Sequence, residues 1–532
     1  MELSSETKNL IEEYKKWYNR EINKEITEPV IEVDEVASRL AFLYEKVREV
    51  VDWKEEQLLM RSAIERILNR RLMLGENEET ARSLIVELVR GGHLQNKKIP
   101  ESKSGEVARI LRKHSYIIDK VKFLTKKEPE ADFLKWMFSL LAVEIEDCLD
   151  HPTREKALIN YMTDVMSERI KLSPEWLKVE PSFEEKKKIF VFVAVQRALF
   201  NLDDIIISFY LLERFYSCTS LPEDQFDDFS NRILDIKNKI EKFLKHPLQE
   251  KIYNICEKYD TAFLLISDVL SKNPNKIENN LNNSPEIEGL VTEAYQGRFD
   301  RLKASLRRAA IYATASIFLS KMILALAIDV PIDKYLGEFN YQTLGINVFF
   351  PPLLMAFLIL SIRPPQKINL QRSIMEVMKL IYKNSKEESY LVRKPIKAGI
   401  LLNTIVVGFY ALSFLVSFGI IFWVLLEKLN FSIFSSLVFV FFLSLISFVG
   451  IRLRQRAKEL TIEEEKEGFL GTIKDILFLP ILRLGKWLSY ELQKHNFLTV
   501  FFNVLIDTPF QAFVEFLEQL RYFIKEKKGE IK

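Results

Sequence analysis

The sequence has little of what a disulfide-stabilised or phosphate-binding protein needs. Three of its 532 residues are cysteine, and Cys148, Cys218 and Cys256 are scattered along the chain. This argues against a disulfide framework and fits a reducing compartment. A glycine-rich phosphate loop, a nucleophile elbow and the paired His-Glu zincin signature are all missing. These absences favour a protein that is not an enzyme and that needs no cofactor.

The chain also lacks an excess of charge of one sign. Its formal net charge is +2, and no block of basic residues interleaved with aromatics occurs in residues 1–308. We therefore expect no nucleic-acid partner. The first twenty residues lack the apolar core of a secretory signal, so we expect no cleaved leader and a cytoplasmic N-terminal part.

Long apolar runs are scarce in the first half of the chain and gathered in the second. Residues 1–308 read as a charged globular protein with helical periodicity almost throughout. The predicted fold class is all-α in three parts. These are a cytoplasmic helical domain (1–305), a four-helix transmembrane region (309–451) and an amphipathic helical C-terminal tail (468–528).

Four apolar segments are long enough for a hydrocarbon core of about 30 Å, which takes roughly 20 helical residues. The predicted spans are 309–330, 342–362, 398–426 and 431–451. The last two carry no charged residue and are joined only by residues 427–430, so they should form an antiparallel hairpin. The first two should form another.

Lysine and arginine are distributed unevenly beside these spans. Nineteen lie in 289–308, 363–397 and 452–466, whereas one lies at each hairpin tip, Lys334 and Lys428. Because basic residues resist export, this asymmetry predicts a multi-pass protein of the cell (inner) membrane. Both termini should lie in the cytoplasm and both tips outside.

One segment in the first half, 189–212, is apolar on every side apart from five polar residues. These are Gln196, Arg197, Asn201, Asp203 and Asp204. In a membrane span, the arginine and the two aspartates would each cost about 2.5–3.5 kcal/mol on insertion scales. We expect instead one buried helix of the soluble domain, with Arg197 paired to a carboxylate rather than acting in catalysis.

The cluster most typical of a metal site is Glu144, Asp147, Cys148 and His151, which share one helical face. Cysteine and histidine three residues apart can bind zinc. The competing interpretation is structural, with His151 at a helix end where the dipole favours an imidazole and Cys148 in the core. No second ligand pair with matching spacing occurs elsewhere, which favours the structural interpretation.

Four residues within the predicted spans are unusual for helices that serve only as membrane anchors: Lys321, Asn347, Pro351 and Pro352. Lys321 lies about 20 Å along the helix axis from Arg308. We expect its side chain to extend outward towards Asp329, and a substrate or proton role is the alternative. The paired prolines predict that the inner helix of the second span begins at Pro351, leaving a separate outer segment as in the broken helices of transporters.

The first predicted hairpin also resembles part of a known group of proteins. With Ser320-Lys321-Met322, Asn347 and Phe350-Pro351-Pro352, the first hairpin resembles that of multi-pass bacterial membrane proteins of uncharacterised function. The resemblance covers the hairpin and the general layout. It implies a multi-pass membrane protein and brings no activity with it.

Two further segments are predicted to lie on the membrane surface. The loop 363–397 contains an apolar stripe opposite basic residues. The tail 468–528 is apolar but interrupted by charges, so it should lie on or dip into the inner leaflet. Both would contact anionic lipid head groups, and the sequence leaves open whether the tail is interfacial or re-entrant.

Two functions follow from this layout. The first is a membrane-anchored helical binding or scaffold protein that recruits a cytoplasmic protein partner. The alternative is a small-solute or ion transporter or channel that uses the proline-broken second span. A membrane-bound enzyme would rest only on the cluster around His151.

Overall fold

The computed structural model describes residues 3–22, 28–34, 59–71, 78–125, 131–178, 182–272, 284–336, 340–360, 367–382, 389–394, 400–457 and 478–488, and also 274, 513, 516, 519, 520 and 523. The chain divides into two compact units. The helical unit comprises Lys8–Lys171, Pro181–Cys256 and Asn496–Lys532, and the apolar-helix unit comprises Met1–Thr7, Leu172–Glu180 and Glu257–His495. Within the described residues two strands of three residues accompany the helices, which confirms the all-α class.

The helical unit is built from short amphipathic helices. They are most of α1 (Ser5–Ile22), then α3 (Leu59–Arg71), α4 (Glu78–Arg90), α5 (Lys103–Thr125), α6 (Ala131–Leu149), α7 (Thr153–Arg169), α9 (Phe183–Phe200), α10 (Asp204–Tyr216), the 3-10 turn η3 (Glu223–Gln225), α11 (Phe226–Leu244) and α12 (Pro247–Cys256). Helices α3 to α6 pack on one another around a common apolar core. Leu88 of α4, Val107 of α5 and Ile145 of α6 are buried in it. Burial of these one-sided apolar stripes is what stabilises the helices.

The predicted single helix over 189–212 is wrong, because the structure has two helices there. Helix α9 ends at Phe200, and α10 begins at Asp204. Asn201 is the C-cap of α9 in the left-handed conformation, with φ 49°. Asp203 is the N-cap of α10, and its side chain accepts a hydrogen bond from the Ile206 N–H at 3.0 Å. Asparagine tolerates the left-handed conformation and aspartate caps helices well, so the three polar residues end one helix and begin the next.

Helix α9 is nevertheless the buried helix that the sequence predicted. Its residues from Phe190 to Gln196 are all buried, and it packs on α7 and α12. Arg197 forms an ion pair with Asp204 at 2.7 Å, which confirms the expected internal partner. The charge near the middle of this apolar run is therefore neutralised within the protein.

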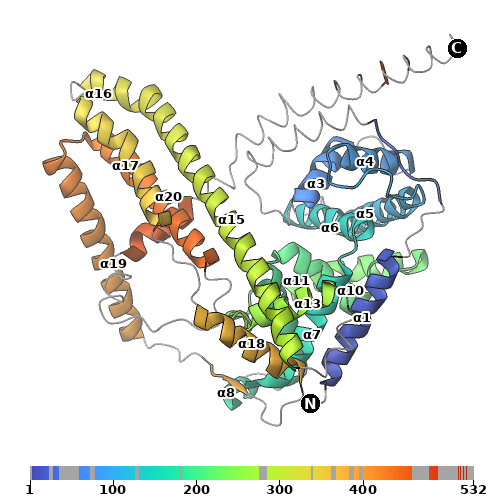
Figure 1. Cartoon of the computed structure of the whole chain (residues 1–532). Helices are drawn as coiled ribbons and strands as arrows, with labels where there is room; N and C mark the ends of the chain where they lie inside the picture. Colours follow the sequence, from blue (N-terminus) through green and yellow to red (C-terminus); the bar gives the residue numbers. More distant parts are fainter. Residues whose placement is uncertain are drawn as a thin grey trace. The chain divides into compact units, whose positions relative to one another are not determined.

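The apolar-helix unit contains the long helices of the chain. Its elements are α8 (Pro174–Leu177), α13 (Asp260–Lys272), α15 (Ser284–Leu324), the π-helix η4 (Ala325–Asp329), α16 (Val330–Leu336), α17 (Tyr341–Leu360), α18 (Lys367–Ile381), β2 (Tyr390–Val392), α19 (Ile400–Trp423), the π-helix η5 (Val424–Lys428) and α20 (Ile433–Ala457). Ser173, which follows strand β1 (Ile170–Leu172), donates its backbone N–H to the Val392 carbonyl of β2 at 3.1 Å. Helix α15 packs on α13, α17, α18 and α20, and α17 packs on α20. Figure 1 shows α15 as one long helix that continues through η4 into α16.

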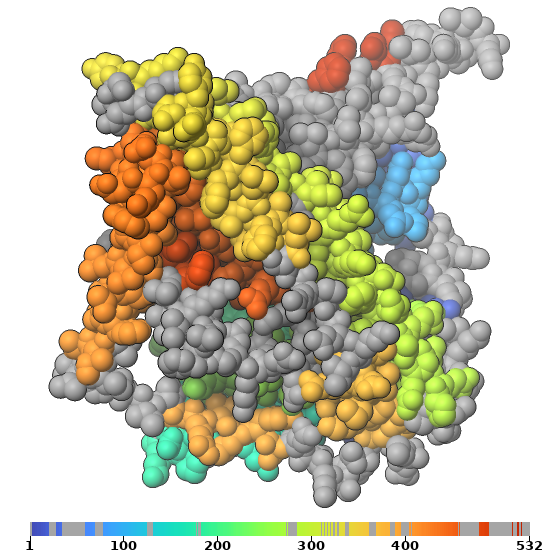
Figure 2. Space-filling model, turned by 60° about the vertical axis from the view of Figure 1, so that its left-hand side comes forward, coloured from blue at the N-terminus to red at the C-terminus, as the bar shows by residue number. Residues whose placement is uncertain are grey.

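Three described stretches are long and apolar enough to cross a membrane. They are Tyr341–Leu360, Val407–Lys428 and Ile433–Gln455, and less than half of each is buried inside the protein. Leu353 and Phe357 of α17 and Leu412 and Leu415 of α19 are more than half exposed. Figure 2 shows the outward surfaces of α16, α17 and α19 in yellow and orange. An apolar surface of this kind is typical of contact with lipid, and these three helices are the candidate membrane spans among the described residues.

The segment predicted as the first span, 309–330, is helical but is not one of these three. It forms the second half of α15 together with η4, and it carries the charged residues Lys321 and Asp329. The helix does not begin at the predicted span, because α15 starts at Ser284.

The predicted break of the second span at Pro351 is wrong. Helix α17 runs without interruption from Tyr341 to Leu360 with Pro351 and Pro352 inside it. Proline removes one backbone donor and disfavours helix before it, but neighbouring helices can hold such a helix together. Here both prolines are buried in the unit, where α17 packs on α15 and α20.

The two predicted surface segments have different outcomes. The middle-loop segment forms α18, whose Val377, Leu380 and Ile381 are buried, and this helix packs on α13 and α15. Its apolar side therefore contacts protein. Most of the predicted tail, 468–528, lies outside the described residues. Residues 478–488 are helical, and Ile481 is buried in the apolar cluster that contains Phe418 of α19 and Phe439 of α20.

Candidate functional site

A charged pair lies buried among the apolar helices. Lys321 of α15 is 0% exposed, and Asp329 at the end of η4 is 1% exposed. The Lys321 Nζ donates a hydrogen bond to Asp329 Oδ2 at 3.3 Å. The intervening π-helix widens the turn that brings the two side chains together, and π-helical turns are frequent at functional sites. The partner of Lys321 that the sequence suggested is thus confirmed.

Two more helices complete this site, which we call the Lys-Asp-Asn cluster: Lys321, Asp329 and Asn347. Asn347 of α17 is 1% exposed and donates its Nδ2 to the same Asp329 Oδ2 at 2.9 Å. The ring of Phe442 from α20 lies under the ammonium group, 4.9 Å from the Lys321 Nζ. An ammonium group over an aromatic face gains electrostatic stabilisation, especially away from water. Residues from α15, η4, α17 and α20 therefore meet at one point.

The cluster is not fully satisfied. Asp329 Oδ1 and Asn347 Oδ1 are buried and have no hydrogen-bond partner among the described residues. Buried acceptors without donors cost about 1–3 kcal/mol each. Two acceptor oxygens of the cluster, one on Asp329 and one on Asn347, therefore remain open beside the Lys321–Asp329 pair.

A second polar contact accompanies the cluster. Asp333 of α16 accepts hydrogen bonds from the hydroxyls of Ser432 at 2.7 Å and Ser435 at 2.8 Å. Thr343 of α17 donates its hydroxyl to the Leu429 carbonyl at 3.4 Å. Hydrogen bonds of this kind hold helices together where lipid supplies no hydrophobic driving force between them.

Of the four predicted intramembrane residues, the structure brings Lys321 and Asn347 together at Asp329. Pro351 and Pro352 lie next along α17, about one turn beyond Asn347. Because proline has no N–H, the carbonyls of Asn347 and Val348 lose their usual donors within the helix. The prolines thus weaken the hydrogen-bond ladder beside the cluster without breaking the helix.

The residues predicted as a possible metal site do not converge on one point. Glu144 is buried against α5, where its carboxylate contacts the Lys113 ammonium and accepts from the His114 Nε2 at 2.8 Å. Asp147 contacts His151 at 3.1 Å and Lys156 at 2.6 Å. Within the described part of the chain no three such side chains are grouped as a metal would need.

The remaining member, Cys148, is a shielded thiol. Its Sγ lies 3.3 Å from Glu106 Oε2 and 3.9 Å from Lys103 Nζ. Burial raises the pKa of Cys148 to about 12, and the carboxylate of Glu106 adds to the rise. A thiol that stays protonated is a poor nucleophile and a poor metal ligand. The four residues therefore serve three separate contacts, and we do not propose a metal there.

Comparisons with protein-family models, curated protein sequences and solved structures returned no match. Sequence reasoning missed the contact of Asp333 with Ser432 and Ser435, because the two sides are about a hundred residues apart. The signal that could have found it is the placement of polar residues at both hairpin tips.

Proposed function

We propose that the protein is a membrane-anchored binding or scaffold protein of the inner membrane. In this proposal the helical part binds a cytoplasmic protein partner. The apolar helices, including the second half of α15 as a fourth span, hold it at the inner leaflet with both termini in the cytoplasm. The excess of lysine and arginine beside the inner ends of the spans supports this orientation. Basic residues of the C-terminal tail would add contacts to anionic lipid head groups.

One observation favours a membrane-anchored binding protein over a transporter. Among the described residues of the apolar-helix unit, the buried charged side chains are Lys321 and Asp329, and they pair with each other. A charge inside the membrane is expensive unless it is paired, and this pair is neutral as a whole. The continuous α17 also removes the broken span on which the transporter hypothesis depended.

The test is to replace the apolar helices and keep the rest. In a chimera, residues 309–457 give way to four unrelated membrane spans of the same topology. Wild type and chimera are cross-linked in intact cells, and the captured proteins are identified by mass spectrometry. The proposal expects the same cytoplasmic proteins from both chains. Loss of those proteins from a correctly inserted chimera would contradict it.

A second function, movement of a cation, is favoured by one specific observation. Among the described residues no donor reaches Asp329 Oδ1 or Asn347 Oδ1, and the Lys321 Nζ lies 3.3 Å from Asp329 Oδ2. Purified protein in proteoliposomes tests it, with a pH-gradient dye for protons and radioactive sodium for sodium ions. A flux above that of empty liposomes that is abolished in Asp329→Asn would establish this function. Equal ion flux in wild type and variant would contradict this second function, and the membrane-anchored binding protein would remain the proposed function.

A further inference from the structure

The helix formed by residues 478–488 contacts both α19 and α20. Among the described helices of this unit, α19 makes extensive contact only with η5, the turn that follows it. Figure 1 shows α19 apart from α17 and α20 along most of its length. Ile481 is buried in the apolar cluster that includes Phe418 of α19 and Phe439 of α20. The short helix therefore links α19 to the rest of the unit.

The contacts of the 478–488 helix lie deep in the candidate spans. The backbone of Gly485 lies so close to the Ser444 carbonyl of α20 that a Cβ has no room there. Ser444 is the midpoint of the span Ile433–Gln455, eleven residues from each end. At a rise of 1.5 Å per residue it lies about 16 Å from either end of the span. In a hydrocarbon core of about 30 Å, Gly485 would therefore lie near the centre.

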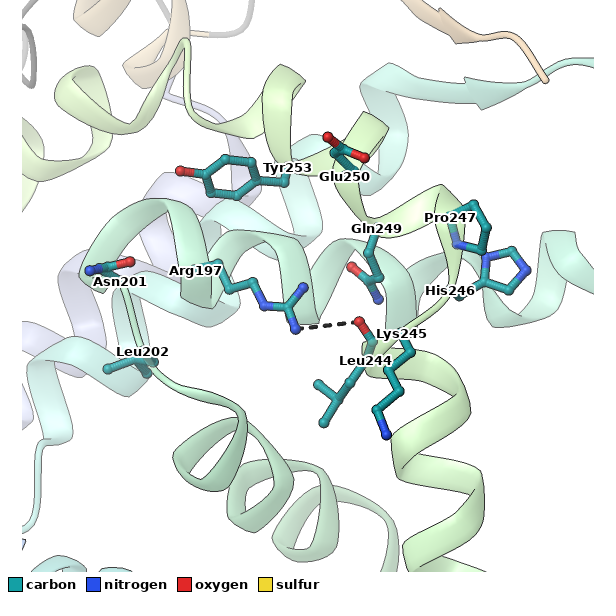
Figure 3. Close-up of a pocket in the computed structure, with 10 residues that line it drawn as sticks. All are labelled: Arg197, Asn201, Leu202, Leu244, Lys245, His246, Pro247, Gln249, Glu250 and Tyr253. Atoms are coloured by element: carbon teal, nitrogen blue, oxygen red, sulfur yellow. Dashed lines mark hydrogen bonds between the residues drawn. The ribbon is translucent and has the colours of Figure 1, made fainter. Parts of the chain in front are cut away.

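In the helical unit, by contrast, an arginine of an apolar helix is neutralised by the chain itself. Arg197 lines a cavity of about 440 Å³ where α9 meets the junction of α11 and α12 (Figure 3). Its guanidinium donates to Asp204 Oδ1 at 2.7 Å and to the Leu244 carbonyl at 3.4 Å. The carboxylate of Glu250 lines the same cavity. This cavity therefore needs no anion from outside the chain.

Two cations of the 478–488 helix differ from Arg197. Among the described residues no carboxylate pairs with Arg483 or Lys486, and both side chains are exposed. The Arg483 guanidinium lies over the ring of Tyr410 of α19, 4.7 Å from its centroid. Tyr410 is three residues from the start of the span Val407–Lys428, hence about 5 Å from that end. Arg483 thus reaches from mid-span depth towards the end of α19 where a tyrosine favours the membrane interface.

The 478–488 helix is too short to cross a membrane. Its eleven residues are about 16 Å long, half the thickness of the hydrocarbon core. A short segment at membrane depth is tolerated where protein covers it, and Pro480, Ile481 and Gly485 are buried. The side chains left for lipid are apolar: Phe478, Leu479 and Trp487.

We propose that residues 478–488 form a re-entrant helix, which enters the inner half of the membrane beside α19 and α20 and directs Arg483 and Lys486 to the lipid phosphate groups of the inner leaflet. Residues three apart share a helical face, so both cations can reach the same layer. A basic side chain that extends to the interface lowers the cost of its charge. The inference rests on the proposed function, because it takes α19 and α20 as membrane spans.

Spin labelling of the full chain in liposomes measures the depth of this helix. After the three native cysteines are replaced, Leu479→Cys, Leu415→Cys and Met375→Cys are labelled, and all three side chains are exposed. Leu415 of α19 is the lipid control, and Met375 of α18 is the water control. Because the hydrocarbon core excludes a polar nickel chelate, the ratio of oxygen to nickel collision rates at Leu479 should lie within about twofold of that at Leu415. A ratio below half that at Leu415 would place the helix on the surface and overturn the proposal.

The same labels separate failure of this inference from failure of the proposed function. If Leu415 gives a high ratio and Leu479 the low ratio of Met375, only the re-entrant helix is wrong. If Leu415 itself matches Met375, α19 does not lie in the membrane, and the proposed function fails together with this inference. Phe478→Cys replaces Leu479→Cys if the latter variant does not fold.

The direction of the basic side chains is tested by one more label. Lys486→Cys should give a lower ratio than Leu479→Cys, since the end of the helix that carries Lys486 approaches the interface. A ratio at Lys486 equal to or above that at Leu479 would overturn the assignment of the two cations to the head groups.

Discussion

At the scale of single residues, the helical unit shows how burial and pairing set the behaviour of charges. Lys113 and Glu144 are both buried in contact with each other, and Lys113 also donates to the Cys218 carbonyl at 2.6 Å. Burial alone would raise the pKa of Glu144, but the hydrogen bond from His114 and the charge of Lys113 reverse this and lower it. For His114 burial lowers the pKa, so the imidazole stays neutral at ordinary pH.

Removing one partner of this pair should cost more than removing both. Glu144→Leu leaves the Lys113 ammonium buried without its carboxylate, and we expect a loss of about 3–5 kcal/mol in the free energy of unfolding. The double variant Lys113→Met/Glu144→Leu should recover most of that loss. Urea unfolding of the full chain in detergent, followed by tryptophan fluorescence, measures both. As a control, Glu184→Ala removes an exposed ion pair with Lys187 and should change stability by less than about 1 kcal/mol. If the double variant loses as much free energy of unfolding as the two single variants added together, Lys113 and Glu144 are not coupled as predicted.

Glu146 should make the helical unit less stable as pH rises. Burial raises the pKa of Glu146 from 4.5 to about 7; the charge of Arg61 opposes this rise, and the charges of Asp150 and Asp147 add to it. Because the folded pKa is the higher one, the stabilising effect is complete below pH 4.5. It is lost as pH rises through 7, by on the order of 3 kcal/mol at most. Glu146→Gln should flatten the pH dependence of the thermal midpoint between pH 5 and 8. An unchanged slope in Glu146→Gln would show that another group is responsible.

At the scale of helices, the close approach of residues 478–488 to α20 depends on glycine. A Cβ added at Gly485 would lie 2.1 Å from the Ser444 carbonyl oxygen, which is backbone and cannot give way. A Cβ at Gly419 on α19 would meet nothing within 4 Å. The 478–488 helix can therefore pack on α20 only with glycine at 485.

The two glycines form a matched pair for mutation. Gly485→Ala should displace the 478–488 helix from α20 and lower the thermal midpoint of the protein in detergent. Gly419→Ala should leave the midpoint unchanged or raise it, since alanine favours helix by up to about 1 kcal/mol over glycine. Cross-linking of cysteines placed at Ile481 and Phe418 reports the same contact. Equal effects of the two substitutions would argue against the packing described here.

Helix α17 supplies the second element-scale prediction. Since α17 is already continuous through Pro351 and Pro352, alanine at both positions would restore N–H donors for the carbonyls of Asn347 and Val348. We expect normal insertion and a thermal midpoint at or above that of the wild type. A lower midpoint would mean that the prolines hold a helix shape on which the Lys-Asp-Asn cluster depends, and would favour the cation-moving function.

At the scale of the whole molecule, the sequence predicted the class and the membrane character but not the tertiary contacts. Helical periodicity and long apolar runs are local signals, so the all-α class and three candidate spans could be read directly. The break between α9 and α10 was missed because Asn201 and Asp203 were read as side chains needing partners rather than as caps. The continuity of α17 was missed because paired prolines were weighed without the helices packed around them.

The residues of the candidate sites also differ in how far the sequence could predict them. Lys321 and Asp329 are eight residues apart, and the sequence could suggest their pairing. Asn347, Phe442 and the open oxygen atoms become visible only when three helices meet. The contact of Arg483 with Tyr410 could not be predicted, since the two residues lie about seventy positions apart and a charged apolar segment also fits the membrane surface.

The central claim is that this chain crosses the membrane with its helical part inside, and cysteine labelling tests it most directly. After the three native cysteines are replaced, single cysteines are introduced at Lys334, Lys428, Lys386 and Glu463. Intact cells are then treated with an impermeant maleimide. The account predicts labelling at 334 and 428, and at 386 and 463 only after the cells are lysed. Labelling of 386 and 463 in intact cells, with 334 and 428 protected, would contradict it.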